Sequence, residues 1–260
     1  MSTPSHPASS SFAGWPGGKR AAVSLSFDDA AVSQLDYVVP ILNRYGVRGT
    51  FYVTPGDGSI FVQHIDRWRQ VHAAGHEIGN HTVLHPCSAK RPWITPDLAL
   101  EGYTLQQIEA EIDDATRRLQ ELLPGYEPTT FAYPCGDTFV GDGEDRVSYI
   151  PSVARRFVAA RGVGSSDNDP ATCDLHNVSS WLVENVTAEQ MIAMIQPTIE
   201  AGRWAIFCFH GVGGDHLRVE AEALEGLVRY LKEREDEIWT DTVYAIGKYV
   251  AQARTSPAAK

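Results

Sequence analysis

Short apolar runs alternate with longer amphipathic segments along almost the whole chain, and this alternation limits the possible folds more than any other feature. The apolar runs have the length of buried strands, and the amphipathic segments repeat apolar residues at helical spacing. Such alternation predicts a parallel sheet covered by helices. With roughly seven strand-helix units in a single domain, a barrel or partial barrel is favoured over an open sheet.

The individual elements are predicted from these patterns. We expect strands at residues 21–27, 48–53, 77–80, 129–133, 204–209 and 238–239. We expect helices at residues 33–45, 61–74, 104–123, 149–160, 187–201, 218–235 and 242–252. Thr104 with Gln107, and Thr187 with Gln190, match the capping-box pattern of helix starts. The connections 86–103 and 134–148 are too long for scaffold turns, which predicts that they are either functional or disordered.

Composition bounds the domain organisation and the partners. Residues 1–18 are rich in Ser, Pro and Gly and are predicted to form a flexible arm, followed by one catalytic domain at 19–253 and a tail at 254–260. Residues 1–18 lack the pattern of a secretory signal, which favours the cytoplasm, with secretion as the alternative if a signal was removed. The net charge of −11 argues against nucleic acid and anionic membranes as partners. The oligomeric state is left open.

Two polar clusters have the chemistry of a metal site. Asp28 and Asp29 directly follow the first predicted strand, where buried carboxylates require partners or a metal, although an aspartate pair can also cap the next helix. His81 and His85 are four residues apart, which predicts two imidazoles on one face of a helical turn. Two histidines and one carboxylate form a set that holds zinc, cobalt or nickel for hydrolysis. The alternative is a pair of surface histidines.

A further histidine ends the most apolar predicted strand. His210 follows FCF and precedes a glycine-rich loop, which places its imidazole at the mouth of a buried sheet. A histidine there can act as a general acid that protonates a leaving group. A hydrogen-bonded core histidine is the alternative.

The four segments FDD, HTVLH, FAYPCG and FCFH, taken together and in this order, resemble the motifs of the polysaccharide deacetylases with a NodB-type domain, the fourth carbohydrate esterase family. The resemblance covers residues 21–250 and implies a distorted (β/α)7 barrel. It also implies a division of roles, in which Asp28 is the catalytic base and His210 the acid. The metal, with zinc expected first, would be held by Asp29, His81 and His85. The backbone N–H of Cys135 would face the oxyanion.

The sequence departs from the family pattern at two places. Ala132 stands where the third motif commonly carries an arginine that orients the catalytic aspartate, so Asp28 needs another partner that the sequence does not identify. The fourth motif is not clear, and Asp169 is our choice for the support of His210, with a solvated acidic loop as the alternative. Cys87 and Cys135 each follow a proline near the expected site, which suggests a disulfide between the two loops, or else two unrelated thiols.

The expected activity is the removal of N- or O-linked acetyl groups from an acetylated oligo- or polysaccharide. Aromatic residues in and beside the long connections are expected to contact the sugar, unless they pack the loops down: Trp93, Tyr133 and Phe139. Two other functions compete with this one. The first is a cyclic amide, imide or allantoin-type hydrolase on the same fold, and the second is a non-catalytic carbohydrate-binding protein.

Overall fold

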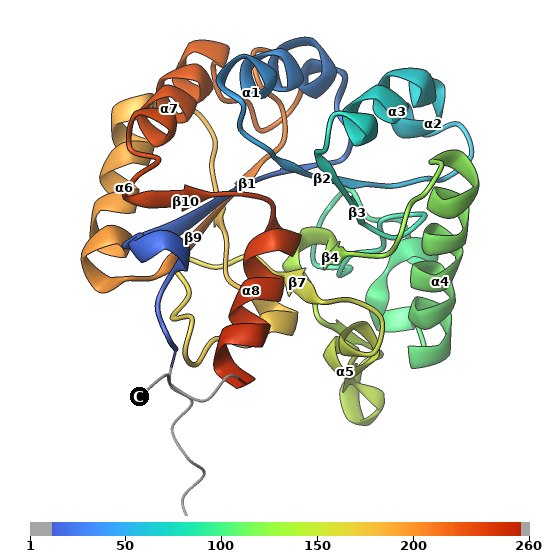
Figure 1. Ribbon diagram of the computed structural model, residues 1–260. Coiled ribbons are helices and arrows are strands. Elements are labelled where there is room, and N and C mark those ends of the chain that lie inside the picture. The colour runs from blue at the N-terminus through green and yellow to red at the C-terminus, as the bar shows by residue number, and fades with distance from the viewer. Residues whose placement is uncertain (1–11, 256–260) are drawn as a thin grey trace, which may run out of the picture.

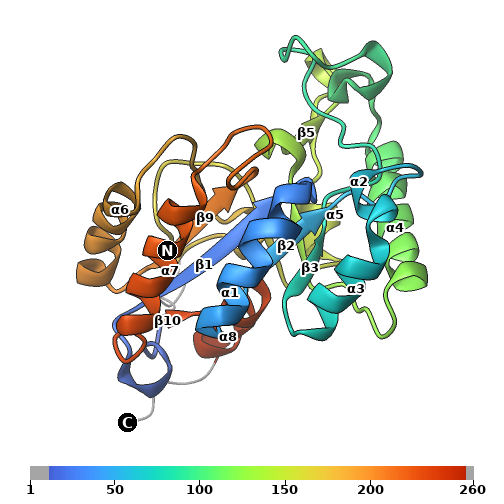
Figure 2. The same cartoon turned by 90° about the horizontal axis from the view of Figure 1, so that it is seen from above.

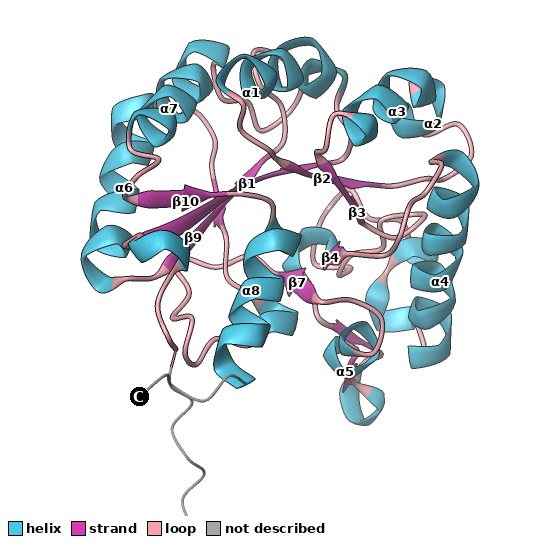
Figure 3. Cartoon of the chain, viewed as in Figure 1, coloured by secondary structure: helices cyan, strands magenta, loops and turns pink. Residues whose placement is uncertain are grey.

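The computed structural model describes residues 12–255, and its centre is one curved sheet of parallel strands with helices outside it (Figures 1 and 3). The strand order is β7-β4-β3-β2-β1-β9-β8, and β10 pairs with β1 beside this path. The strands are β1 (Ala21–Asp28), β2 (Thr50–Val53), β3 (Glu77–Asn80), β4 (Thr130–Ala132), β7 (Ala159–Arg161), β8 (Trp181–Leu182), β9 (Trp204–Phe209) and β10 (Ile238–Thr240). Parallel bridges from Arg161 to Val178 and from Gly164 to Trp181 bring the two ends of the path together. The predicted distorted (β/α)7 barrel is therefore confirmed.

The helices cover the barrel from outside. They are α1 (Val39–Tyr45), α2 (Ile60–Gln63), α3 (Ile65–Ala73), α4 (Leu105–Leu122), α5 (Ile150–Ala154), α6 (Ala188–Ala201), α7 (Ala221–Glu233) and α8 (Val243–Thr255). Figure 1 shows α6, α7, α1, α3 and α4 as an arc around the strands, with α8 on the opposite side between β9 and β7. None of the helices in the described part of the chain is both long and apolar enough to cross a membrane.

The central strand β1 explains why the sheet is buried on both faces. All eight residues of β1 are buried, and Val23, Leu25 and Phe27 belong to the core shared with the outer helices. The alternate residues face the barrel interior, where Ser26 Oγ donates to the carbonyl of Phe207 at 2.7 Å and Ser24 Oγ accepts from Trp204 Nε1 at 3.1 Å. Polar side chains are thus tolerated inside the barrel because each is hydrogen-bonded.

Most predicted helices are present, with local differences. Both capping boxes are formed, at Thr104 for α4 and at Thr187 for α6. The helix expected at 33–45 starts as a π-helical segment (Gln34–Val38) before α1. The helix expected at 61–74 is divided at His64 into α2 and α3.

The helix predicted at 149–160 is wrong in its second half. The helix α5 ends at Ala154, and Ala159–Arg161 forms strand β7 beside β4. Strand β8 was not predicted either. Both strands are only two or three residues long, so neither shows a periodicity of its own, and pairing with neighbouring strands decides their conformation.

Two short strands and the long connections lie beyond the barrel. The segments β5 (Phe139–Val140) and β6 (Val147–Ser148) form a small antiparallel hairpin. Figure 2 shows this hairpin projecting together with the segment between β3 and α4 at one end of the molecule. The predicted arm lies mostly outside the described residues, but Phe12 and Trp15 pack against Tyr249 and the core below the sheet.

Candidate metal and catalytic site

The two aspartates lie at the carboxyl end of β1, where the side chain of Asp28 is buried and that of Asp29 is partly exposed. Asp28 is the last residue of the strand and is 4% exposed. Asp29 and Ala30 have positive φ angles of 70° and 54°, so the chain turns sharply directly after Asp28. This turn places the Asp29 side chain at the opening while Asp28 stays inside. The helix-cap alternative does not apply, because the hydrogen bonds of both carboxylates go to other partners.

The second pair, His81 and His85, meets Asp29 as predicted. The Nε2 atoms of both histidines lie 3.7 Å from Asp29 Oδ1. One donor atom from each of the three residues lies within 4.8 Å of the other two. The three residues expected to hold a metal therefore come together in the structure.

The predicted helical turn at His81–His85 is wrong, because this segment is an irregular loop. Thr82 and His85 have positive φ angles of 63° and 55°. The loop is held from within by Asn80 Oδ1, which accepts from Thr82 N at 2.8 Å. It is held from α4 by Glu111 Oε2, which accepts from Val83 N and Leu84 N at 3.2 and 3.0 Å. These tertiary bonds, and not helical spacing, bring the imidazoles together.

The orientation of His81 suits a metal ligand. Its Nδ1 lies 2.8 Å from the carbonyl oxygen of Ala132. A carbonyl only accepts hydrogen bonds, so Nδ1 carries the hydrogen and Nε2 keeps its lone pair. Burial lowers the pKa of His81 to about 4, so the ring is neutral at neutral pH. A neutral imidazole with a fixed Nε2 fits a divalent ion such as zinc.

Two further histidines surround the other oxygen of Asp29. His216 Nε2 lies 3.0 Å from Asp29 Oδ2, and His210 Nε2 lies 3.8 Å from the same atom. Burial by itself raises the pKa of Asp29, but the hydrogen bond with His216 and the nearby imidazoles outweigh it, so the pKa lies below its usual range. His216 was not predicted; its sequence signal is a histidine six residues after His210 in the same glycine-rich loop.

The catalytic candidates Asp28 and His210 lie beside these donors. Asp28 Oδ2 lies 3.9 Å from His81 Nε2, and donor atoms of Asp28 and His210 lie within 4.8 Å of each other. Burial raises the pKa of Asp28, but Arg161 and two histidines outweigh burial and leave it lowered. Asp28 Oδ1 and His210 Nδ1 are buried and have no hydrogen-bond partner among the described residues. Buried polar atoms without a partner are uncommon in native proteins, so both call for an explanation.

The charged partner of Asp28, which the sequence did not identify, is Arg161. Its Nη2 donates to Asp28 Oδ2, and its side chain is fully buried. The sequence prediction missed Arg161 because it lies in β7, which was assigned to a helix that ended at residue 160. The signal was present, since the apolar run Phe157–Ala160 ends in a charged residue, as the other site motifs do.

Cys135 lies near His85, since their side-chain donor atoms lie within 4.8 Å of each other. It has a φ of 55° inside the turn Pro134–Gly136. No hydrogen bond from its backbone N–H forms within the described residues, whereas the N–H groups of Tyr133 and Gly136 on either side are bonded. A free N–H beside the metal donors suits an oxyanion.

The suggested disulfide between Cys87 and Cys135 is present. Their Cα atoms are 6.0 Å apart. The bond ties the loop that carries His81 and His85, the histidine loop, to the turn Pro134–Gly136, the oxyanion loop. Cys173 and Cys208 are free. We expect mass spectrometry after alkylation of the unfolded protein to find two modified cysteines without reductant and four after reduction. Four modified cysteines in an oxidising preparation would contradict the disulfide.

The predicted roles of Asp169, as a support for His210, and of Tyr133, as a contact to the sugar, are wrong. Asp169 Oδ1 accepts from Ala171 N at 2.8 Å and caps its own turn, so it does not support His210. Tyr133 is 1% exposed and donates its hydroxyl to the carbonyl of His176, so it is not available to a substrate. Trp93 and Phe139 are exposed, at 68% and 37%.

Comparisons with known proteins agree with this geometry. A sequence model of the family "Polysaccharide deacetylase" matches residues 17–142, which contain the metal donors and Cys135. The matched part is just under half of the chain, and it is similar to the polysaccharide deacetylases. Among curated relatives, a chitin deacetylase from Arthroderma benhamiae is 28% identical over 95 residues, which are 36% of this chain and 25% of the relative. A gellan lyase from a Bacillus species is 27% identical over 171 residues, 65% of this chain and 6% of the relative. The chain thus spans a minor part of these relatives.

Solved structures show the same fold. A protein from Mycobacterium smegmatis, provisionally named a polysaccharide deacetylase, has a TM-score of 0.68 and 19% identity, with 99% of this chain and 98% of that one covered. An acetyl xylan esterase from Clostridium thermocellum, determined with a cobalt ion, has a TM-score of 0.55 and 22% identity, with 87% and 90% covered. The peptidoglycan deacetylase PdaC from Bacillus subtilis has a TM-score of 0.51 and 17% identity, with 90% and 93% covered.

Proposed function

We propose that this protein removes acetyl groups from an oligo- or polysaccharide by metal-dependent hydrolysis. The observation that carries the proposal is the convergence of Asp29, His81 and His85, with the carboxylate of Asp28 beside them at 3.9 Å from His81 Nε2. A base next to a three-donor metal set is the arrangement that activates water for attack on a carbonyl. The similarity of residues 17–142 to the polysaccharide deacetylases supports the class of substrate.

A divalent ion fits these donors because two neutral imidazoles and one ionised carboxylate form a facial set with open positions. Asp29, His81 and His85 would hold it. When bound, the ion would lower the pKa of water and polarise the acetyl carbonyl. Zinc is our first expectation, with cobalt and nickel as alternatives.

The chain's own residues provide the proton transfers. Asp28 takes a proton from the attacking water, while Arg161 holds its carboxylate in place. The N–H of Cys135 donates to the oxygen of the acetyl group as that oxygen becomes negative. His210 then donates a proton to the departing alcohol or amine, and acetate is released.

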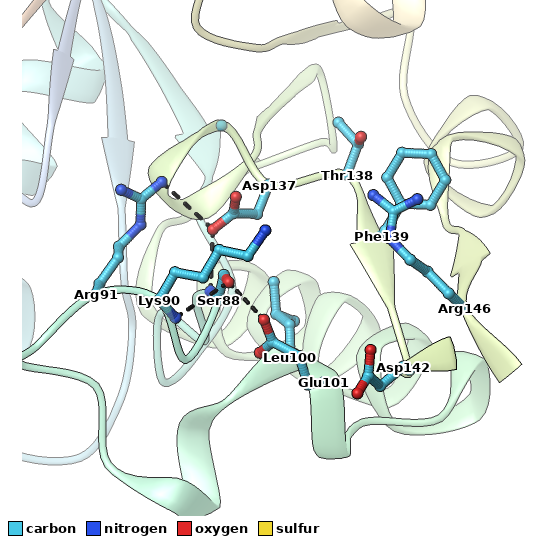
Figure 4. Close-up of a pocket in the computed structure, with 12 residues that line it drawn as sticks. Ser88, Lys90, Arg91, Leu100, Glu101, Asp137, Thr138, Phe139, Asp142 and Arg146 are labelled. Carbon is cyan, nitrogen blue, oxygen red and sulfur yellow. Dashed lines mark hydrogen bonds and ion pairs between the residues drawn. The ribbon is translucent and has the colours of Figure 1, made fainter. Parts of the chain in front are cut away.

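A pocket beside the oxyanion loop is the proposed place for a neighbouring sugar unit. It has a volume of about 430 Å³ and is lined by both long connections, including Ser88, Lys90, Gly136 and Asp142 (Figure 4). Ser88 N donates to Asp137 Oδ2 at 3.0 Å, which joins the two connections at the pocket wall. The Arg146 guanidinium lies 3.6 Å from the Phe139 ring centroid, so one face of this ring is already covered.

The test is acetate release from acetylated xylan, xylo-oligosaccharides and chitin oligomers, before and after chelation and zinc re-addition. We expect release that is lost with the chelator and restored by zinc. The responding substrates distinguish ester from amide cleavage. Metal-loaded protein that releases no acetate but hydrolyses allantoin or a cyclic imide would contradict the proposal, as would oligosaccharide binding without any turnover.

A further inference from the structure

We propose that Arg161 is a positioning residue that orients Asp28 for catalysis, and that it does so from the strand next to the one that carries Ala132. This inference rests on the proposed function in one respect, namely that Asp28 is the catalytic base. The position of the Asp28 carboxylate depends on its contact with Arg161, whatever reaction the site performs.

The guanidinium of Arg161 is held on several sides. Nη2 donates to Asp28 Oδ2, while Nη1 lies 3.3 Å from Ser180 Oγ and 3.4 Å from the carbonyl oxygen of Gly162. Its Cζ lies 5.1 Å from the centroid of the Tyr52 ring. A planar group held in this way presents its donor to Asp28 in one direction.

The contact with Arg161 gives the two carboxylate oxygens of Asp28 different surroundings. Oδ2 is occupied by Arg161 and has Cys208 Sγ at 3.4 Å, whereas Oδ1 has no partner among the described residues. Rotation of the carboxylate would break the contact with Arg161. Both side chains are buried, so each charge would lose its partner away from solvent, which is unfavourable. Arg161 thereby fixes the orientation of the carboxylate, with Oδ2 at 3.9 Å from His81 Nε2.

Strand register explains why an arginine at position 161 can serve this purpose. Strands β4 and β7 pair in parallel, with Ala132 opposite Arg161. Directly paired residues on neighbouring strands project to the same face of a sheet. Both side chains therefore start at the same level on the barrel interior. Ala132 is fully buried and small, so it leaves space for the long side chain of its neighbour.

The test compares wild type with Arg161→Met, Arg161→Lys, Arg161→Ala and the double variant Arg161→Ala with Ala132→Arg. We expect Arg161→Met to lower kcat for acetate release at least about a hundredfold, with KM and zinc affinity of the apoprotein changed less than about threefold. The lysine variant is expected to lose about tenfold, because an ammonium keeps the charge but lacks the planar pair of donors. The double variant should recover at least about tenfold over Arg161→Ala, since residue 132 faces the same interior.

A merely structural role would give a different pattern. Arg203→Met is the control for a lost ion pair outside the site. Arg203 Nη1 lies 3.0 Å from Asp167 Oδ1, and the Arg203 side chain is more exposed than that of Arg161. Arg203→Met should change thermal stability without changing kcat. If Arg161→Met loses stability like the control but keeps kcat within threefold, the positioning role is wrong. If that variant does not fold, full kcat in Arg161→Lys overturns the proposal in the same way.

Crystal structures provide a readout that does not depend on activity. In Arg161→Met we expect the Asp28 carboxylate to rotate or to adopt several positions, while Asp29, His81 and His85 stay in place. An unmoved Asp28 would overturn the proposal even if the wild-type protein released no acetate. Lack of acetate release by wild type, together with a displaced Asp28 in the variant, would instead contradict only the proposed function.

Discussion

Asp28→Asn should lower kcat for acetate release at least about a thousandfold, because an amide cannot accept the proton that the attacking water loses. The substitution keeps the size of the side chain and an oxygen that accepts from Arg161, so Asp29, His81 and His85 should still bind one zinc ion. We expect some loss of thermal stability, since the buried Arg161 then lacks an ionised partner. Steady-state kinetics, zinc titration and thermal unfolding measure the three effects.

The control for this prediction is Asp167→Asn. Asp167 also contacts an arginine, Arg203, and is mostly buried, with 10% of its side chain exposed. It lies outside the site, so kcat should stay unchanged. A kcat within tenfold of wild type for Asp28→Asn, in protein that binds zinc normally, would show that Asp28 is not the base.

His81→Ala should abolish both metal binding and activity. Loss of a residue that merely orients a ligand costs about 10- to 100-fold in metal affinity, so loss of a ligand itself should exceed a hundredfold. His81 is 1% exposed, so its truncation also leaves a cavity beside Asp28 and Asp29. Zinc titration of the apoprotein and acetate release at saturating zinc would measure the effect.

His72→Ala is the control for the metal ligand, because His72 lies in the last turn of α3, away from the metal donors. It should bind zinc with wild-type affinity. An apparent zinc affinity within threefold of wild type for His81→Ala would rule out His81 as a ligand. In that case the donors Asp29, His210 and His216, which also lie within 4.8 Å of one another, would be the next set to test.

Asp29 could be predicted from a sequence motif, whereas the role of Arg161 as the partner of Asp28 could not. Asp29 was predicted because it stands in a motif directly after a long apolar strand, and the carboxyl ends of parallel strands meet at one edge. Arg161 stands after a strand of three residues that has no periodicity of its own. Its role depends on the pairing of β7 with β4, and such a pairing cannot be read from local residues.

The histidine loop gives a second example. His81 and His85 were correctly predicted to meet, but for the wrong reason, because helical spacing does not hold them together. Two residues with positive φ and the carboxylate of Glu111 shape the loop. Positive φ at a threonine or a histidine is unfavourable in isolation, so only the surrounding contacts stabilise it.

The sequence by itself determined the elements whose signals are local. Continuous apolar runs specified β1 and β9, and capping boxes specified the starts of α4 and α6, because these preferences act within a few residues. The tertiary structure alone decided the partner of Asp28, which is 133 residues away in the chain. It also decided that His216 contacts Asp29 and that Asp169 does not reach His210. These outcomes depend on strand register and loop packing, which bring together side chains that have no pattern in common along the chain.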